Sequence, residues 1–196
     1  MKKLLLSLAI FLTATLTAVA ADKPIVWEER TLGKADAPIT ITEYASLGCS
    51  HCAHFHATTF PELKKNYIET GKAKFIFRDF SLDPLSLQAA QITRCLPEKQ
   101  FFGFIGILFK NQAEWVNATG DITAVKKFAT QAGMTEAAFK ACLDNKALND
   151  ALLEKRLEAS NTLKVESTPT FFINGEKMSG DMSFENFEKK LNAAAK

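Results

Sequence analysis

Two cysteines with only two residues between them, Cys49 and Cys52, stand between an apolar stretch and a helical pattern. A thiolate is the reactive form of cysteine, and two thiols at this spacing can close into a small disulfide. The helical pattern begins at Ser50, so we expect Cys49 at the N-terminal end of a helix, where unpaired N–H groups and the helix dipole favour negative charge. The sequence therefore predicts a redox-active dithiol.

The residues between the cysteines, Ser50 and His51, are the candidates for tuning the thiolate. His51 cannot lie far from the Cys49 sulfur, and an imidazolium or an imidazole N–H there would stabilise negative charge. Such effects together can lower a cysteine pKa from about 8.5 to between about 3.5 and 7.5. A lower pKa stabilises the reduced form, so it makes the disulfide more oxidising.

Other uses of the two cysteines are a structural disulfide, haem attachment or zinc. Haem is excluded because Ala53, not histidine, follows Cys52. For zinc, four ligand-type residues fall within eight positions: Cys49, Cys52, His54 and His56. A structural zinc site usually takes its ligands from two separated pairs, and a continuing helix would point both histidines away from the thiols. We predict no metal site.

Glu43 is a less obvious candidate. It shares one face of the predicted strand 39–45 with Ile39, Ile41 and Ala45, so an acid lies in an apolar row six residues before Cys49. One interpretation is a glutamate that reaches solvent at the strand end. The other is a partly buried acid beneath the disulfide that passes a proton to or from Cys52.

The remaining strand patterns lie on both sides of a long helical region. β-Branched and aromatic residues predict strands at 74–80, 170–173 and 176–179, the last two joined by an Asn174-Gly175 turn. Ile25, Val26 and Trp27 form a small apolar group that could be a short edge strand.

Helical spacing predicts a helix from Ser50 that Pro61 kinks or divides and Gly71 terminates. Further helices are expected at 84–96, 99–110, 121–133, 135–143 and 146–163, and a closing helix after Ser183. About 80 residues of helix are too many for one crossover. We therefore predict an α/β domain, residues 21–82 and 163–196, interrupted by an inserted helical domain, residues 83–162.

The first twenty residues have the pattern of a secretory signal peptide. Lys2 and Lys3 precede an apolar stretch, and Ala18-Val19-Ala20 is a small-x-small cleavage pattern, so cleavage is expected after Ala20. An uncleaved anchor is the alternative, although the stretch is shorter than the roughly 20 residues a span needs. Without Lys2 and Lys3 the chain has 22 basic and 22 acidic residues, so nucleic-acid binding is not expected.

Cys95 and Cys142 both fall in the helical region. In an exported chain such a leftover pair should bond, and closing a loop of about 48 residues would contribute up to about 4 kcal/mol. The alternative is two buried free thiols.

These features together resemble the DsbA-like branch of the thioredoxin superfamily over nearly all of the chain after residue 20. The resemblance rests on the helical insertion and on Glu43, Cys49-Ser50-His51-Cys52, Phe60-Pro61-x-Leu63, Thr70-Gly71-Lys72, Phe77-Arg78-Asp79-Phe80 and Ser167-Thr168-Pro169-Thr170-Phe171 before Asn174-Gly175.

The resemblance implies a thioredoxin fold, a central mixed β-sheet flanked by helices, in which Pro169 is cis and faces the disulfide. Backbone groups at Thr168 would pair with an extended substrate peptide. Cys49 would be the exposed nucleophile and Cys52 the buried resolving thiol, with no cofactor besides their disulfide.

It further implies recharging by a quinone-linked membrane partner. We therefore predict a periplasmic enzyme, acting as a monomer, that introduces disulfides into exported proteins with free thiols. Two residues depart from the pattern of the best-known oxidases. Ser50 stands where those oxidases have proline, and Thr168 stands where they have a different residue. Threonine before the cis proline also occurs in isomerase-type relatives. The alternatives are a reductase or isomerase of this fold or, from another class, an exported metal-binding module using Cys49, Cys52, His54 and His56.

Overall fold

The computed structural model describes residues 25–116, 120–179 and 183–194, so the predicted signal peptide lies outside the described residues. Its centre is a five-stranded mixed sheet in the order β1-β3-β2-β4-β5. β2 and β3 are parallel, and the other three pairs are antiparallel. The strands are β1 (Arg30–Leu32), β2 (Ile39–Ala45), β3 (Ala73–Asp79), β4 (Thr170–Ile173) and β5 (Glu176–Ser179).

The predicted strands 39–45, 170–173 and 176–179 are confirmed, and the strand expected at 74–80 lies one residue earlier. Asn174 and Gly175 both have positive φ, 48° and 90°, as a tight hairpin turn requires. The edge strand expected at Ile25–Trp27 is wrong. Ile25 and Val26 are 41% and 48% exposed, and the segment that pairs with β3 is Arg30–Leu32.

Three helical pieces link β2 to β3: α1 (Ser50–Thr58), α2 (Phe60–Leu63) and a π-helical turn, η1 (Lys64–Ile68). The predicted break near Pro61 is confirmed, since one residue, Thr59, separates α1 from α2. Pro61 is the second residue of α2, where its missing N–H costs no helical hydrogen bond. Gly71, at φ 77°, then turns the chain into β3.

The long segment between β3 and β4 is helical, as predicted. It holds α3 (Pro84–Cys95), the 3-10 turn η2 (Glu98–Gln100), α4 (Phe101–Lys110), α5 (Gln112–Trp115), α6 (Thr123–Gln131), α7 (Glu136–Leu143) and α8 (Lys146–Leu163), and α9 (Phe184–Ala194) closes the described chain. Asp83, Thr135 and Asn145 cap α3, α7 and α8 through their side chains. The short α5 was not predicted, because four residues carry no helical periodicity.

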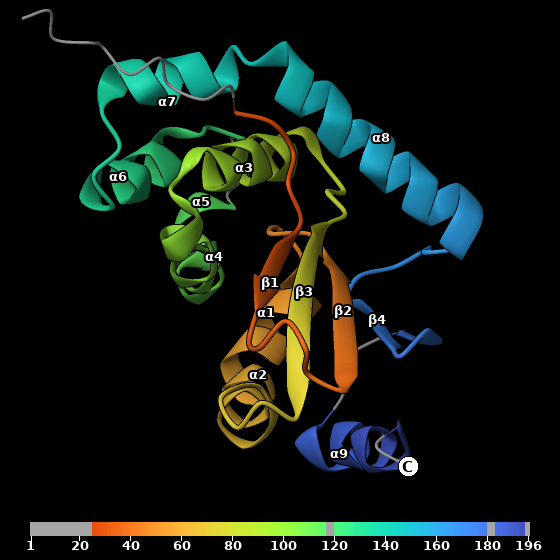
Figure 1. Cartoon of the computed structure of the whole chain (residues 1–196). Helices are drawn as coiled ribbons and strands as arrows, with labels where there is room; N and C mark the ends of the chain where they lie inside the picture. The colour runs from red at the N-terminus through yellow and green to blue at the C-terminus, as the bar shows by residue number, and fades with distance from the viewer. Residues whose placement is uncertain (1–24, 117–119, 180–182, 195–196) are drawn as a thin grey trace, which may run out of the picture.

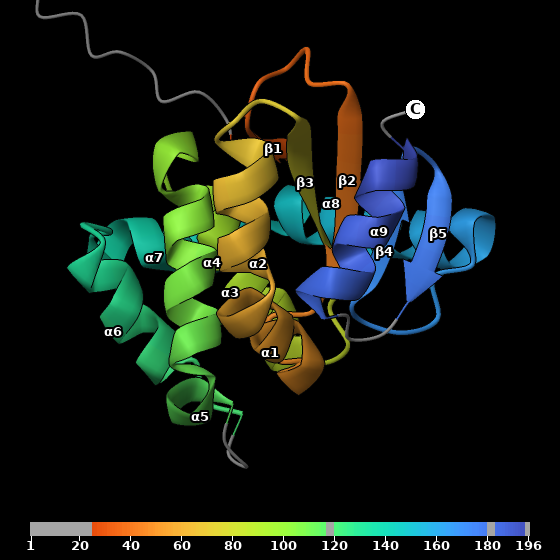
Figure 2. The same cartoon turned by 90° about the horizontal axis from the view of Figure 1, so that it is seen from below.

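Helices cover both faces of the sheet. α1, α2 and α9 lie on one face and α8 on the other, while α4, α6 and α7 gather beyond the β1 edge (Figures 1 and 2). A mixed sheet with helices on both faces and a helical segment between β3 and β4 agrees with the predicted fold class. Within the described residues, no helix is both long and apolar enough to span a membrane.

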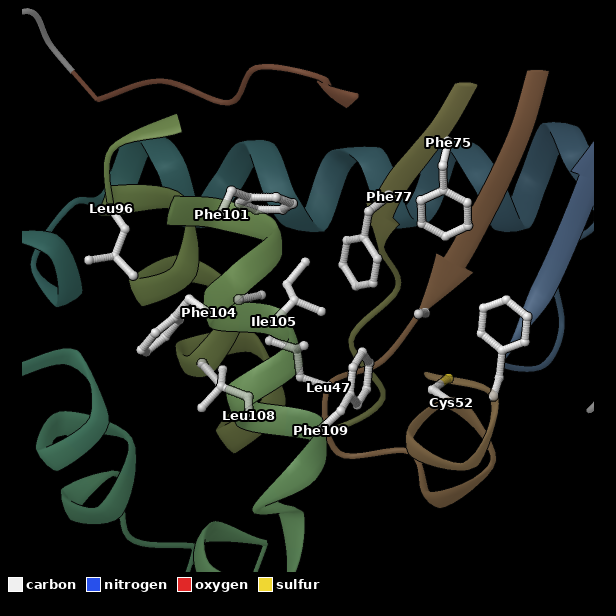
Figure 3. Packing of buried hydrophobic residues seen from close by; sticks show 14 of the residues in the cluster. Leu47, Cys52, Phe75, Phe77, Leu96, Phe101, Phe104, Ile105, Leu108 and Phe109 are labelled. Atoms are coloured by element: carbon white, nitrogen blue, oxygen red, sulfur yellow. The ribbon is translucent and has the colours of Figure 1, made fainter. Parts of the chain in front are cut away.

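Successive side chains of β2 point to opposite faces of the sheet and so belong to two separate core clusters. Ile39, Ile41 and Ala45 join the large cluster that fills the space between the sheet, α1 and α4, and Figure 3 shows phenylalanines of β3 and α4 meeting there beside Cys52. Tyr44 faces the opposite way and packs with Phe80 and with Ala159 of α8. Glu43, between Thr42 and Tyr44, belongs to the α1 face.

α3 ties the helical region to the sheet. The guanidinium of Arg94 is buried and donates to Asp79, at the end of β3, with Nε and Oδ2 2.7 Å apart. The next residue, Cys95, forms a disulfide with Cys142 of α7 across 47 residues of sequence. The amide of Gln91 also donates to the Cys142 carbonyl.

Replacing both Cys95 and Cys142 by serine should lower the free energy of unfolding by about 2–4 kcal/mol, because the unfolded chain loses a long closed loop. This corresponds to a melting temperature lower by roughly 5–15 °C. Circular dichroism would measure the melt, and alkylation would test Cys49, which should stay reactive. Loss of Cys49 reactivity in a variant that is still folded would contradict this separation of the two cysteine pairs.

Candidate functional site

A tight loop holds the first cysteine at the end of β2. The N–H of Cys49 donates to the Ser46 carbonyl at 3.0 Å, and the Cys49 carbonyl accepts the first helical hydrogen bond, from Ala53. Gly48 presses against the start of α3, where a Cβ at this position would collide with the Ser86 hydroxyl. A larger residue would have to displace this hydroxyl. The loop places Cys49 as the N-cap of α1.

Cys49 is partly exposed and easily ionised. Its pKa lies well below the ordinary range for cysteine, at about 5, chiefly because the Cys52 thiol donates a hydrogen bond to the thiolate. Partial burial opposes this shift. The Thr168 side chain and the backbone N–H groups of Cys52 and His51 lower the pKa further.

Cys52 has the opposite character. It is 0% exposed, on the inner face of α1 (Figure 3). Burial raises its pKa, as do its hydrogen bond to Cys49 and the negative charge of Glu43. The two sulfurs, both free thiols here, therefore differ strongly in their readiness to ionise.

The loop before β4 faces the first thiol. The Thr168–Pro169 peptide bond is cis, and the Cys49 thiol donates to the Thr168 carbonyl with Sγ and O 3.3 Å apart. Among the described residues, the buried Thr168 hydroxyl has no hydrogen-bond partner while Cys49 is a thiol. The fold thus brings together residues 119 positions apart in sequence.

Ser50 and His51 are both exposed at the start of α1. His51 lowers the pKa of Cys49 through its backbone N–H rather than through its ring. Tuning by the His51 imidazole and by the Ser50 side chain therefore stays a prediction, whereas the backbone contribution follows from the helix start.

Glu43 does not reach solvent, so the first interpretation of this residue is wrong. Its neighbours across the sheet are Phe77 of β3 and Phe171 of β4, and its side chain is 0% exposed. One carboxylate oxygen, Oε2, lies 2.8 Å from Nε2 of His56, whereas Oε1 is buried without a partner among the described residues. A buried acid therefore lies close enough to Cys52 to affect its ionisation.

His56 was considered in the sequence only as a metal ligand. Its side chain is 6% exposed and its ring stacks on Phe109 of α4, with centroids 4.3 Å apart. His54, by contrast, is exposed. In the described part of the chain, no group of three or more histidine, cysteine, aspartate and glutamate side chains is placed to hold a metal ion.

Gln112 of α5 is a site residue that sequence reasoning missed. Its Nε2 donates to the carbonyls of Leu47 and Cys49, at 2.7 and 3.0 Å. It fixes the loop that ends in Cys49 from the helical region. No sequence signal pointed to it, because a lone glutamine beyond an apolar helix has no characteristic spacing to the cysteines.

The site combines an accessible thiol that ionises readily, a buried thiol that does not, a buried acid and a peptide backbone opposite the first sulfur. An incoming sulfur can reach Cys49 but not Cys52. These are the requirements of dithiol–disulfide exchange.

Residues 26–193 match a family model described as thioredoxin. A putative protein-disulfide oxidoreductase of Rickettsia felis is 30% identical over 164 residues, which cover 83% of this chain and 59% of that protein. The chain thus spans little more than half the length of this curated relative.

Two solved structures are also similar. The alpha-DsbA1 of Wolbachia pipientis is 32% identical, with a TM-score of 0.81 over 85% of this chain and 90% of that one. A protein-disulfide isomerase from Novosphingobium aromaticivorans is 26% identical, with a TM-score of 0.78 over 85% of this chain and 97% of that one.

The thiolate absorbance of the reduced protein should titrate with a midpoint near pH 5, the pKa of Cys49. In the unfolded chain this thiol ionises near pH ~8.5, so its stabilising contribution is complete above that pH and is lost as the pH falls through about 5. Cys52 stays protonated in the folded state over this range. In the unfolded chain it ionises only near pH ~8.5, where it offsets a small part of the Cys49 contribution.

Urea unfolding of the reduced and oxidised proteins at pH 8.5 and pH 5 tests this sign. Other titrating groups cancel in the difference between the two forms. The reduced form should lose stability relative to the oxidised form as the pH falls. An unchanged difference would contradict a lowered Cys49 pKa.

Gln112→Ala should lower the free energy of unfolding by about 1–3 kcal/mol, since two loop carbonyls lose their donor. Urea unfolding would measure the loss, with Glu114→Ala, an exposed change on the same short helix, as the matched control. Equal stability of the two variants would show that the Gln112 hydrogen bonds do not hold the loop.

Proposed function

Because this chain belongs to the DsbA-like branch of the thioredoxin family, we propose that it is a thiol:disulfide oxidoreductase that introduces disulfide bonds into folding exported proteins. The observation that carries the proposal is the contrast between the two sulfurs: Cys49 is partly exposed with a pKa of about 5, and Cys52 is buried with a raised pKa.

The reaction starts from the Cys49–Cys52 disulfide. A substrate thiolate attacks Cys49, the bond between the two cysteines breaks, and Cys52 leaves and takes up a proton. A second substrate thiolate then attacks the substrate sulfur of the mixed disulfide and releases Cys49 as a thiolate. The substrate has lost two electrons and gained a disulfide, and the enzyme is left as the dithiol.

The low pKa of Cys49 supports the oxidising direction. Stabilising the Cys49 thiolate favours the reduced enzyme and the release of Cys49 from a mixed disulfide, since a thiol of lower pKa leaves faster. Both effects drive disulfides from the enzyme into the substrate. The Cys49–Cys52 disulfide is the only redox group that this reaction needs.

The cis Thr168–Pro169 loop is the proposed substrate-binding element. Its backbone lies against the Cys49 sulfur, so an extended peptide paired with Thr168 would bring its own thiol to Cys49. We assign thiolate tuning to His51 and Ser50, and proton transfer with Cys52 to Glu43, which is buried beside it.

Export to the periplasm is the second part of the proposal. It rests on the signal-peptide pattern of residues 1–20 and on the Cys95–Cys142 disulfide, a bond that persists in oxidising compartments. The proposed partners are exported proteins with free thiols and a quinone-linked membrane oxidase that restores the Cys49–Cys52 disulfide. We propose that the enzyme acts as a monomer.

The reduction potential of the Cys49–Cys52 pair, measured against glutathione, distinguishes the proposed oxidase from a reductase. We expect a value above the ~−180 mV of protein disulfide isomerase and towards the ~−120 mV of DsbA. A value near the ~−270 mV of thioredoxin would exclude the oxidase.

Oxidation of a reduced two-cysteine peptide by the disulfide form would test the activity itself. Cys49→Ser should abolish transfer. Cys52→Ser, mixed with the oxidised peptide, should attack its disulfide through Cys49 and remain as a mixed disulfide.

A further inference from the structure

The buried Glu43–His56 pair has a role that the steps above leave open. When Cys52 leaves as a thiolate in a fully buried position, it needs a proton, and bulk water does not reach it. Glu43 is placed to supply that proton, but its carboxyl group is itself 0% exposed, so it needs a donor of its own. His56 is the titratable residue in contact with it, with Nε2 and Oε2 2.8 Å apart.

His56 lies between this buried acid and the surface. Together with Phe60, Phe102 and Phe109 it lines a groove of about 610 Å³ between α1 and α4. The ring is held by stacking on Phe109 and by Phe60, with centroids 4.3 and 4.8 Å apart. One edge of the imidazole therefore meets Glu43 while the rest of the side chain borders a groove open to solvent.

We propose that His56 is a proton-relay residue that connects Cys52, through Glu43, to solvent in the groove between α1 and α4. The proposal rests on the oxidase function proposed above. Before the step the pair is a Glu43 carboxylate and a His56 imidazolium. As Cys52 leaves, the imidazolium gives its proton to the carboxylate, which passes a proton on to Cys52. The neutral imidazole then regains a proton from solvent in the groove, so the pair returns to its starting state with no net charge.

The partners of Glu43 favour this role over a purely structural ion pair. A buried carboxylate kept only for stability would be expected to have both oxygens satisfied, whereas Oε1 has no hydrogen-bond partner among the described residues. The charge of Glu43 also contributes to the raised pKa of Cys52, so the acid and the thiol interact.

The groups facing His56 are few. β2 contributes Glu43, and β3 and α2 contribute aromatic rings. The other titratable residues lining the groove are His54 of α1 and Lys110 of α4, both of them exposed. Only a protonated imidazole can supply a proton to Glu43, so the relay makes the rate depend on the protonation of His56.

The experiment is a single-turnover oxidation of a reduced dithiol peptide, with the rate expressed per substrate thiolate, from pH 5 to 9. The wild-type rate should fall as the pH rises and His56 loses its proton. His56→Gln keeps a hydrogen-bond donor for Glu43 but has no proton to transfer, so it should slow the reaction at least about tenfold at pH 6 and remove this fall with pH. His54→Gln, in the same groove, should keep the wild-type rate and profile.

Further variants test whether His56 acts through Glu43. In a Glu43→Gln background, His56→Gln should cause no additional loss, because one step is already missing. Added imidazole should restore part of the rate of His56→Ala, since the groove is open to small molecules.

Different results would exclude the proton relay and the proposed function. If the wild-type rate shows no fall with pH that His56→Gln removes, or if His56→Gln matches the wild type, the relay is wrong and the oxidase stands. If the oxidised wild-type protein transfers no disulfide at any pH, the proposed function itself fails.

Discussion

The hydrogen bond between the two sulfurs at the start of α1 is the interaction on which the site depends. It stabilises charge on Cys49 and opposes charge on Cys52, so a single contact makes two chemically identical side chains unequal. The loop at Gly48, the hydrogen bond from Cys49 to the Thr168 carbonyl and the burial of Cys52 all hold this contact in place. Without it, the Cys49 thiolate would lose the largest of the interactions that lower its pKa.

Much of the fold could be predicted from the sequence. β2, β4, β5 and the break at Pro61 followed from periodicity and turn chemistry, because these signals are local. The edge strand was misplaced, since Ile25 and Val26 look like a strand only when the partner strand is ignored. The bounds of β1 are set by its register with β3, where Arg30 pairs with Phe77.

The site was predicted less evenly. The cysteine motif and the cis proline were found because each has a recognisable spacing or sequence context. The burial of Glu43 was only one of two interpretations, because its surroundings come from β3 and β4. Gln112 and the inward position of His56 could not be found, since each depends on how α4 and α5 pack against the loop and α1.

α3 has a consequence for how the enzyme meets its substrates. One helix contacts Gly48 at its first turn, carries the buried Arg94–Asp79 pair near its end and is crosslinked to α7 through Cys95. The helical region and the sheet are thus anchored to each other on both sides of the cysteine loop. Such a frame is preorganised, so in the proposed reaction the conformational entropy lost in forming a mixed disulfide falls on the substrate chain.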